Sequence, residues 1–64
     1  MSSTDAAELS SLSTTLDDLI RRIGGMAGRY GTQEDVEGAL RDAETALITA
    51  RRRVEAAGRS LGSG

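Results

Sequence analysis

Hydrophobic residues recur along the first half of the chain at spacings that alternate between three and four. The run comprises Leu9, Leu12, Leu16, Leu19, Ile23, Met26 and Tyr30. This is the a/d heptad pattern of helices that pack at a shallow angle, and the period of two that a strand requires does not fit it. The pattern predicts a helix over about residues 4–30.

A second run with the same periodicity fills the rest of the chain. It comprises Val36, Leu40, Ala43, Leu47, Ala50, Val54, Ala57 and Leu61. We expect a second helix over about residues 33–60, followed by a flexible tail at 61–64 that is rich in glycine and serine. Alanine occurs once per heptad in this run, so the run predicts an alanine-rich seam that lets two helices approach closely.

A short link between the runs predicts how the two helices are connected. Gly31 is expected to adopt the left-handed conformation that ends a helix, and Thr32 with Asp35 resembles a capping box for the next one. A turn at 31–32 between helices of similar length predicts an antiparallel two-helix hairpin. The whole chain, 1–64, is then a single coiled-coil-like domain of the all-α class.

The hairpin hypothesis also predicts a register. Folding about the link brings together positions whose numbers add to about 62 or 63, which places Leu16 opposite Leu47 and Leu19 opposite Ala43. Large residues would then meet alanine in every second layer of the contact. We expect charged pairs on the flanks to favour this register over slipped alternatives.

Three glycines interrupt the first helical pattern and leave two interpretations open. Gly24, Gly25 and Gly28 each disfavour a helix by ~1 kcal/mol relative to alanine. The helix could therefore end at Ile23, with a flexible loop up to the turn. It could equally continue to Tyr30, because Met26 and Tyr30 keep the heptad spacing, and we favour continuation.

The small size of the chain predicts a partner. A chain of 64 residues with one aromatic residue and no cysteine buries little surface and has no disulfide to hold it together. Ile20, Ala27 and Ile48 fall outside the predicted seam on one flank, and Tyr30 lies at the tip. We expect these residues to form an interface with a second copy, giving a homodimeric four-helix bundle, or with a helical partner protein.

The missing residue types exclude most chemistry. Without histidine or cysteine the common metal ligand sets and nucleophile pairs are gone, so we expect no catalytic, metal or cofactor site and no enzyme activity. No apolar stretch is long enough to span a membrane, and the first residues do not resemble a secretion signal. We therefore expect a cytoplasmic protein.

An arginine run provides the alternative function. Arg51, Arg52 and Arg53, together with Arg22, could contact phosphates of a nucleic acid in a regulator built as a hairpin dimer. The net charge of −2 and the single aromatic residue favour a solvated helix face instead. The preferred prediction is therefore a small soluble module for protein–protein interaction or structure that acts through helical-bundle assembly. A regulatory role for this module is left open.

Overall fold

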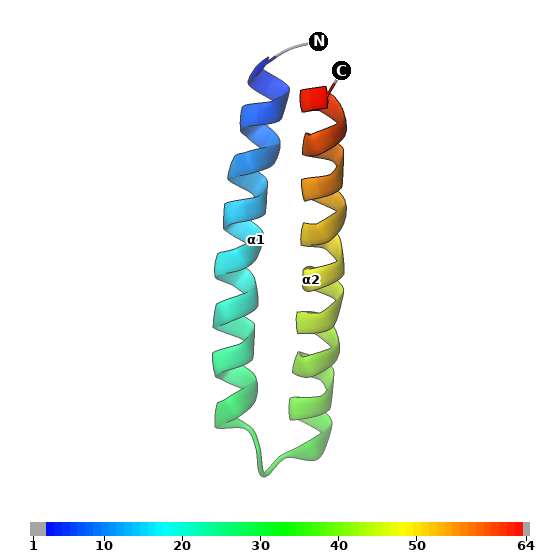
Figure 1. The fold of residues 1–64 in the computed structure, drawn as a ribbon. Coiled ribbons are helices and arrows are strands. Elements are labelled where there is room, and N and C mark those ends of the chain that lie inside the picture. The colour runs from blue at the N-terminus through cyan, green and yellow to red at the C-terminus, as the bar shows by residue number, and fades with distance from the viewer. Residues whose placement is uncertain (1–2, 64) are drawn as a thin grey trace.

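The computed structural model describes residues 3–63 and consists of two antiparallel helices packed side by side (Figure 1). Helix α1 spans Ser3–Arg29 and helix α2 spans Glu34–Ser63. The start of α1 and the end of α2 lie at the same end of the molecule, opposite the connecting turn. The predicted all-α antiparallel hairpin is confirmed.

Helix α1 runs through Gly24, Gly25 and Gly28 without a break, so the helix continues beyond Ile23. Ala27, which is fully buried, packs beyond that point despite the low helix propensity of the neighbouring glycines. Met26 and Tyr30, whose spacing predicted the continuation, are exposed. The flexible tail predicted at 61–64 is wrong over its described part, because α2 continues to Ser63 and Leu61 is half-buried. Gly64 lies outside the described residues.

The link between the helices comprises four residues, 30–33, and not two. The Tyr30 amide donates to the Ala27 carbonyl at 3.1 Å, and the Gln33 amide donates to the Tyr30 carbonyl at 2.9 Å. The Gln33 carbonyl then accepts from the Glu37 amide at 2.9 Å, which opens α2. The prediction of a left-handed Gly31 is wrong, since no glycine among residues 3–63 has a positive φ; consecutive turns reverse the chain instead.

The contact between the helices is a heptad seam, but each helix is rotated from its predicted position. On both helices one row of residues at seven-residue spacing faces inward as expected, and it is made of Leu9, Leu16 and Ile23 on α1 and Leu40, Leu47, Val54 and Leu61 on α2. The second inward row lies one residue further along than predicted. It consists of Ser13, Ile20 and Ala27 on α1 and Glu37, Glu44, Arg51 and Gly58 on α2.

The rows that were predicted to complete the seam lie outside it. Leu12 is 46% exposed and Met26 41%, and Ala50 and Ala57 are exposed as well, whereas Leu19, Val36 and Ala43 are half-buried. Tyr30, which was predicted to extend the inward row of Ile23, is 37% exposed. The predicted alanine-rich seam is therefore wrong for Ala50 and Ala57, whereas Ala43 is half-buried. Apolar residues fill three adjacent rows of α1, whereas a single neighbouring helix covers only two rows.

Contacts between the helices repeat every seven residues and define the register. Residues that meet, or that line the same groove, are Gly31 with Glu37, Gly24 with Glu44, Asp17 with Arg51, and Ser10 with Gly58. The predicted register would have placed Asp17 opposite Ala46, five residues before Arg51. The link of 30–33 has the same midpoint as the predicted turn of 31–32, and the reach of Arg51 toward the start of α2 accounts for part of the offset.

The molecule is elongated and has very little interior. Its Cα trace measures 49 × 14 × 10 Å, and its radius of gyration is 14.7 Å, against about 11 Å for a compact domain of this length. Ala27 is the only fully buried residue among those whose side chains are described. Over residues 3–63 neither helix has an apolar segment of the length that crossing a membrane requires.

The burial of Ala27 generates a stability prediction. Ala27→Leu should lower the free energy of unfolding by about 1–3 kcal/mol, because the added atoms have no space at a residue that is 0% exposed. Ala7→Leu, at an exposed position of the same helix, is the matched control and should change it by less than about 0.5 kcal/mol. Urea unfolding followed by circular dichroism measures both, and equal effects would contradict the seam described above.

Candidate interaction surface

The rotation of the helices gives the hairpin two different broad faces. On one of them, the polar face, Asp17 and Gly24 of α1 lie beside Arg51 and Glu44 of α2. At the end of the hairpin remote from the turn, this face carries an open groove of about 410 Å³. The groove is lined by Ala6, Leu9, Ser10, Ser13, Val54, Glu55, Gly58 and Arg59.

Arg51 is the centre of the polar face. Its Nη1 donates to Asp17 Oδ1 across the helices at 2.5 Å, and its Nε lies 4.0 Å from Glu55 Oε1. The hydrogen bond to Asp17 raises the pKa of Arg51 above its ordinary value, and the charges of Asp17 and Glu55 act in the same direction against the opposing effect of desolvation. Arg51 is therefore charged at every physiological pH, and its ion pair with Asp17 joins the two helices on this face.

Glu44 occupies the next heptad position toward the turn. Its carboxylate lies over Gly24, so closely that a methyl group on Gly24 would stand 2.7 Å from Glu44 Oε2. Arg41 Nη1 lies 3.3 Å from Glu44 Oε1 and holds the carboxylate from the same helix. The glycine at position 24 thus makes room for a charged side chain that crosses the helix contact.

The opposite broad face, which we call the apolar face, is lined by the rows left outside the seam. These rows are Leu12, Leu19 and Met26 of α1 and Val36, Ala43, Ala50 and Ala57 of α2. At the end remote from the turn, Leu12 and Leu61 share an open groove of about 370 Å³ with Asp5, Glu8 and Leu9. Because the seven-residue spacing keeps each row on one side of its helix, large residues of α1 run along one edge of this face and alanines of α2 along the other.

The structure distributes the predicted interface residues differently from the sequence prediction. Ala27 is fully buried in the hairpin, so the prediction that it lies on a free flank is wrong. Ile20 and Ile48 are half-buried, and Ile20 belongs to the seam itself. Tyr30 remains exposed at the tip. The sequence prediction placed inside the seam a row of α1 that lies outside it, of which Leu12 and Met26 are exposed and Leu19 is half-buried. The opposite charges of Asp17 and Arg51 were the signal that could have revealed the rotation.

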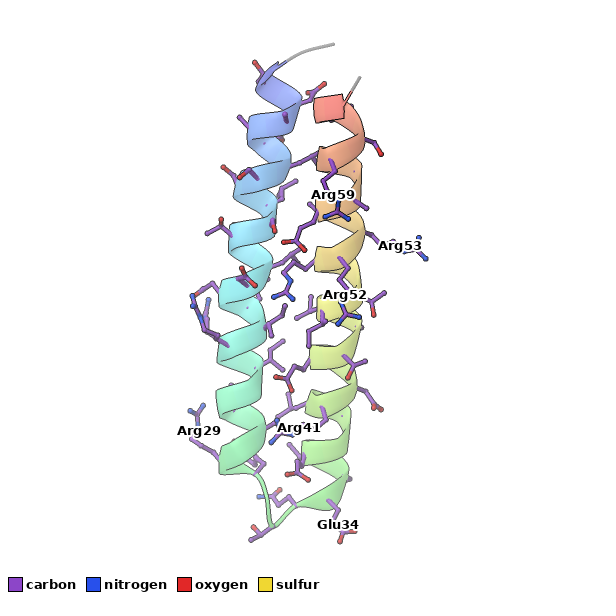
Figure 2. All side chains as sticks on the ribbon, viewed as in Figure 1. Arg29, Glu34, Arg41, Arg52, Arg53 and Arg59 are labelled. Carbon is purple, nitrogen blue, oxygen red and sulfur yellow. The ribbon has the colours of Figure 1, made fainter. Side chains whose placement is uncertain are left out.

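The four arginines of the predicted phosphate-contacting strip do not gather on one surface. Arg51 is held by Asp17 between the helices, and Arg22 Nη1 lies 3.6 Å from Asp18 Oδ2 on α1. Arg53 points outward from α2, away from α1, whereas Arg52 lies on another side of the same helix (Figure 2). Their side chains therefore do not form a continuous basic strip.

The acidic residues offer no metal centre within residues 3–63, because no group of three or more of them is arranged to hold an ion. The carboxylates of Asp17, Asp18, Glu44 and Glu55 form ion pairs along and between the helices. These pairs are Asp17–Arg51, Asp18–Arg21, Asp18–Arg22, Glu44–Arg41 and Glu55–Arg51.

No protein-family model, curated protein sequence or solved structure matches this chain.

The glycines of α1 generate a second prediction. Gly25→Ala should raise the free energy of unfolding by about 1 kcal/mol, because alanine favours a helix and the new methyl group meets nothing within 4 Å. Gly28→Ala should behave in the same way. Gly24→Ala should raise the free energy of unfolding by less, because the Glu44 carboxylate must move aside to make room for the new methyl group. Urea midpoints measure the differences, and an equal gain at Gly24 would show that Glu44 does not occupy that space.

The ion pair between the helices generates a third prediction. Asp17→Asn should lower the urea midpoint more than Asp18→Asn, because Asp17 joins α1 to α2, whereas Asp18 contacts Arg21 and Arg22 of its own helix. The difference should shrink as salt is added, since these side chains are partly exposed and screened. Because the pKa of Arg51 is raised, the contribution of the pair persists up to the ordinary arginine pKa and is lost as pH rises through the folded-state value. Equal midpoints for the two variants would rule out the cross-helix role of Asp17.

Proposed function

We propose that this protein is a small interaction module that pairs with a second copy through its apolar face to form a four-helix bundle. The observation that carries the proposal is the exposure of Leu12 and Met26, at 46% and 41%, in a chain whose described residues include one fully buried side chain. Exposed apolar side chains in continuous rows are typical of an interface and not of a free surface. The bundle then supplies the interior that the single hairpin lacks.

The surface area of the hairpin supports assembly. A single chain exposes 4573 Å², against about 3,900 Å² for a compact monomer of 6.7 kDa. The broad face measures 49 × 14 Å along the Cα trace, about 700 Å² in projection, which is close to the ~800 Å² that each partner contributes to a standard interface. The apolar face is therefore large enough for one stable contact of ordinary size.

The composition of the apolar face favours a second copy as the occupant. Large side chains lie on α1 and alanines on α2, both at seven-residue spacing, so the face is complementary to itself under a two-fold rotation. Fully burying a leucine or methionine stabilises an assembly by ~1.5–3 kcal/mol. Leu12, Leu19 and Met26, present twice in a dimer, would supply most of this stabilisation.

The polar face has a different role in this proposal. The Asp17–Arg51 pair and Glu44 cover one side of the seam with charge, which disfavours docking of an apolar partner on that side. Assembly is thereby restricted to one face, so that the dimer closes and does not grow into a larger aggregate. Closure by one self-complementary face is the mechanism we propose for the module.

The proposal predicts a variant that separates the two copies. Leu12→Asp should weaken dimerisation at least a hundredfold, because a charge replaces a side chain buried once in each copy. The helix content of the monomer should remain, since Leu12 lies outside the intramolecular seam. Sedimentation equilibrium gives the association constant and circular dichroism gives the helix content.

Thr14→Asp is the matched control, because it adds the same charge at an exposed position of the same helix. It should leave association unchanged. A wild-type chain that is monomeric at every concentration would overturn the homodimer and leave a helical partner protein as the occupant of the face. Salt-sensitive binding of RNA or DNA, weakened by Arg53→Ala but not by Leu12→Asp, would instead support the nucleic-acid regulator.

A further inference from the structure

We infer that the two copies pack with their two-fold axis parallel to the helices, so that α1 of each copy lies on α2 of the other and both turns lie at the same end of the bundle. This inference rests on the proposed dimer and adds its geometry. It is argued from the register of the hairpin and from the sizes of the residues on the apolar face.

The register sets which residues stand at the same height along the long axis. Asp17 meets Arg51 and Gly24 meets Glu44. Moving seven residues forward along α1 therefore corresponds to moving seven residues toward the start of α2. On the apolar face the large residues of α1 consequently come level with gaps between small residues of α2. Leu12 is level with the segment between Ala50 and Ala57, Leu19 with that between Ala43 and Ala50, and Met26 with that between Val36 and Ala43.

A two-fold axis parallel to the helices preserves these heights. It carries α2 of the second copy over α1 of the first, so Leu19 enters the space between Ala43 and Ala50 of the second copy. Leu12 and Met26 do the same one heptad to either side. Each large side chain then fills a hole bounded by small ones, which is the packing that coiled coils require.

A two-fold axis perpendicular to the helices gives a poorer match. It lays α1 on α1 and α2 on α2, with the turns at opposite ends. With the axis at the height of Leu19, Leu19 would meet Leu19 of the second copy, and Ala50 would meet Ala43. The crowded contact between leucines would hold the copies apart where the alanines need close approach, and a gap would remain between the two α2 helices.

The absence of cysteine from the chain makes a distance measurement straightforward, because a single introduced cysteine takes the only spin label. Thr32→Cys places the label at the exposed tip, away from the apolar face. With both turns at one end, helices packed at interaxial distances of ~8–10 Å put the two labels roughly 15–25 Å apart. With the turns at opposite ends, the labels would be separated by nearly the full 49 Å of the long axis.

Cross-linking gives an independent readout. Leu19→Cys and Ala50→Cys chains, unfolded and refolded together, should form a disulfide between the two different variants on mild oxidation. The Leu19→Cys chain alone should cross-link at least fivefold less, because the two cysteines then lie on diagonally opposed helices. Efficient cross-linking of Leu19→Cys to itself would favour the perpendicular axis.

The outcomes separate this inference from the proposed dimer. A mass of two chains with labels near 20 Å supports both. A mass of two chains with labels near 49 Å keeps the dimer and overturns the packing of α1 on α2. A mass of one chain overturns the dimer, and with it the inference.

Discussion

The structure depends on the difference between the width of the apolar stripe on α1 and the width that one helix can cover. Apolar residues occupy three adjacent rows of α1, and one neighbouring helix covers only two of them. Leu9, Leu16 and Ile23 face inward under either rotation of the helix, so the choice lies between the row of Ile20 and the row of Leu19. The hairpin fully buries Ala27 of the first row, whereas Leu12 and Met26 of the second row are exposed and Leu19 is half-buried. Whichever row is left over becomes a surface that a further helix can cover.

Electrostatic contacts between the helices favour the rotation that leaves the row of Leu12, Leu19 and Met26 outside the seam. With Ile20 and Ala27 inside, Asp17 reaches Arg51 at 2.5 Å and Gly24 accommodates the carboxylate of Glu44. The opposite rotation would separate these groups. One polar face and one apolar face therefore follow from the same rotation.

The sequence was sufficient to predict the class of the fold, the antiparallel arrangement and the helix bounds near the turn. The spacing of leucines and alanines is a local signal, and it held through Gly24, Gly25 and Gly28. The rotation could not be predicted from periodicity, because Leu12 and Ser13, or Ala50 and Arg51, differ by a single position on the helix. The small size of alanine was the only reason to predict the alanine row inside the seam. In the hairpin the neighbouring row of Glu44, Arg51 and Gly58 takes that place.

The most direct test of the apolar face as an interface is an isotope-filtered NMR experiment on a refolded mixture of labelled and unlabelled chains. Only contacts between different copies give signals in such a mixture. The account predicts contacts of the Leu12 and Leu19 methyl groups with the methyl groups of Ala43, Ala50 and Ala57. Intermolecular contacts confined to Ile48 and the polar face, or none at concentrations where the chain sediments as a dimer, would contradict it.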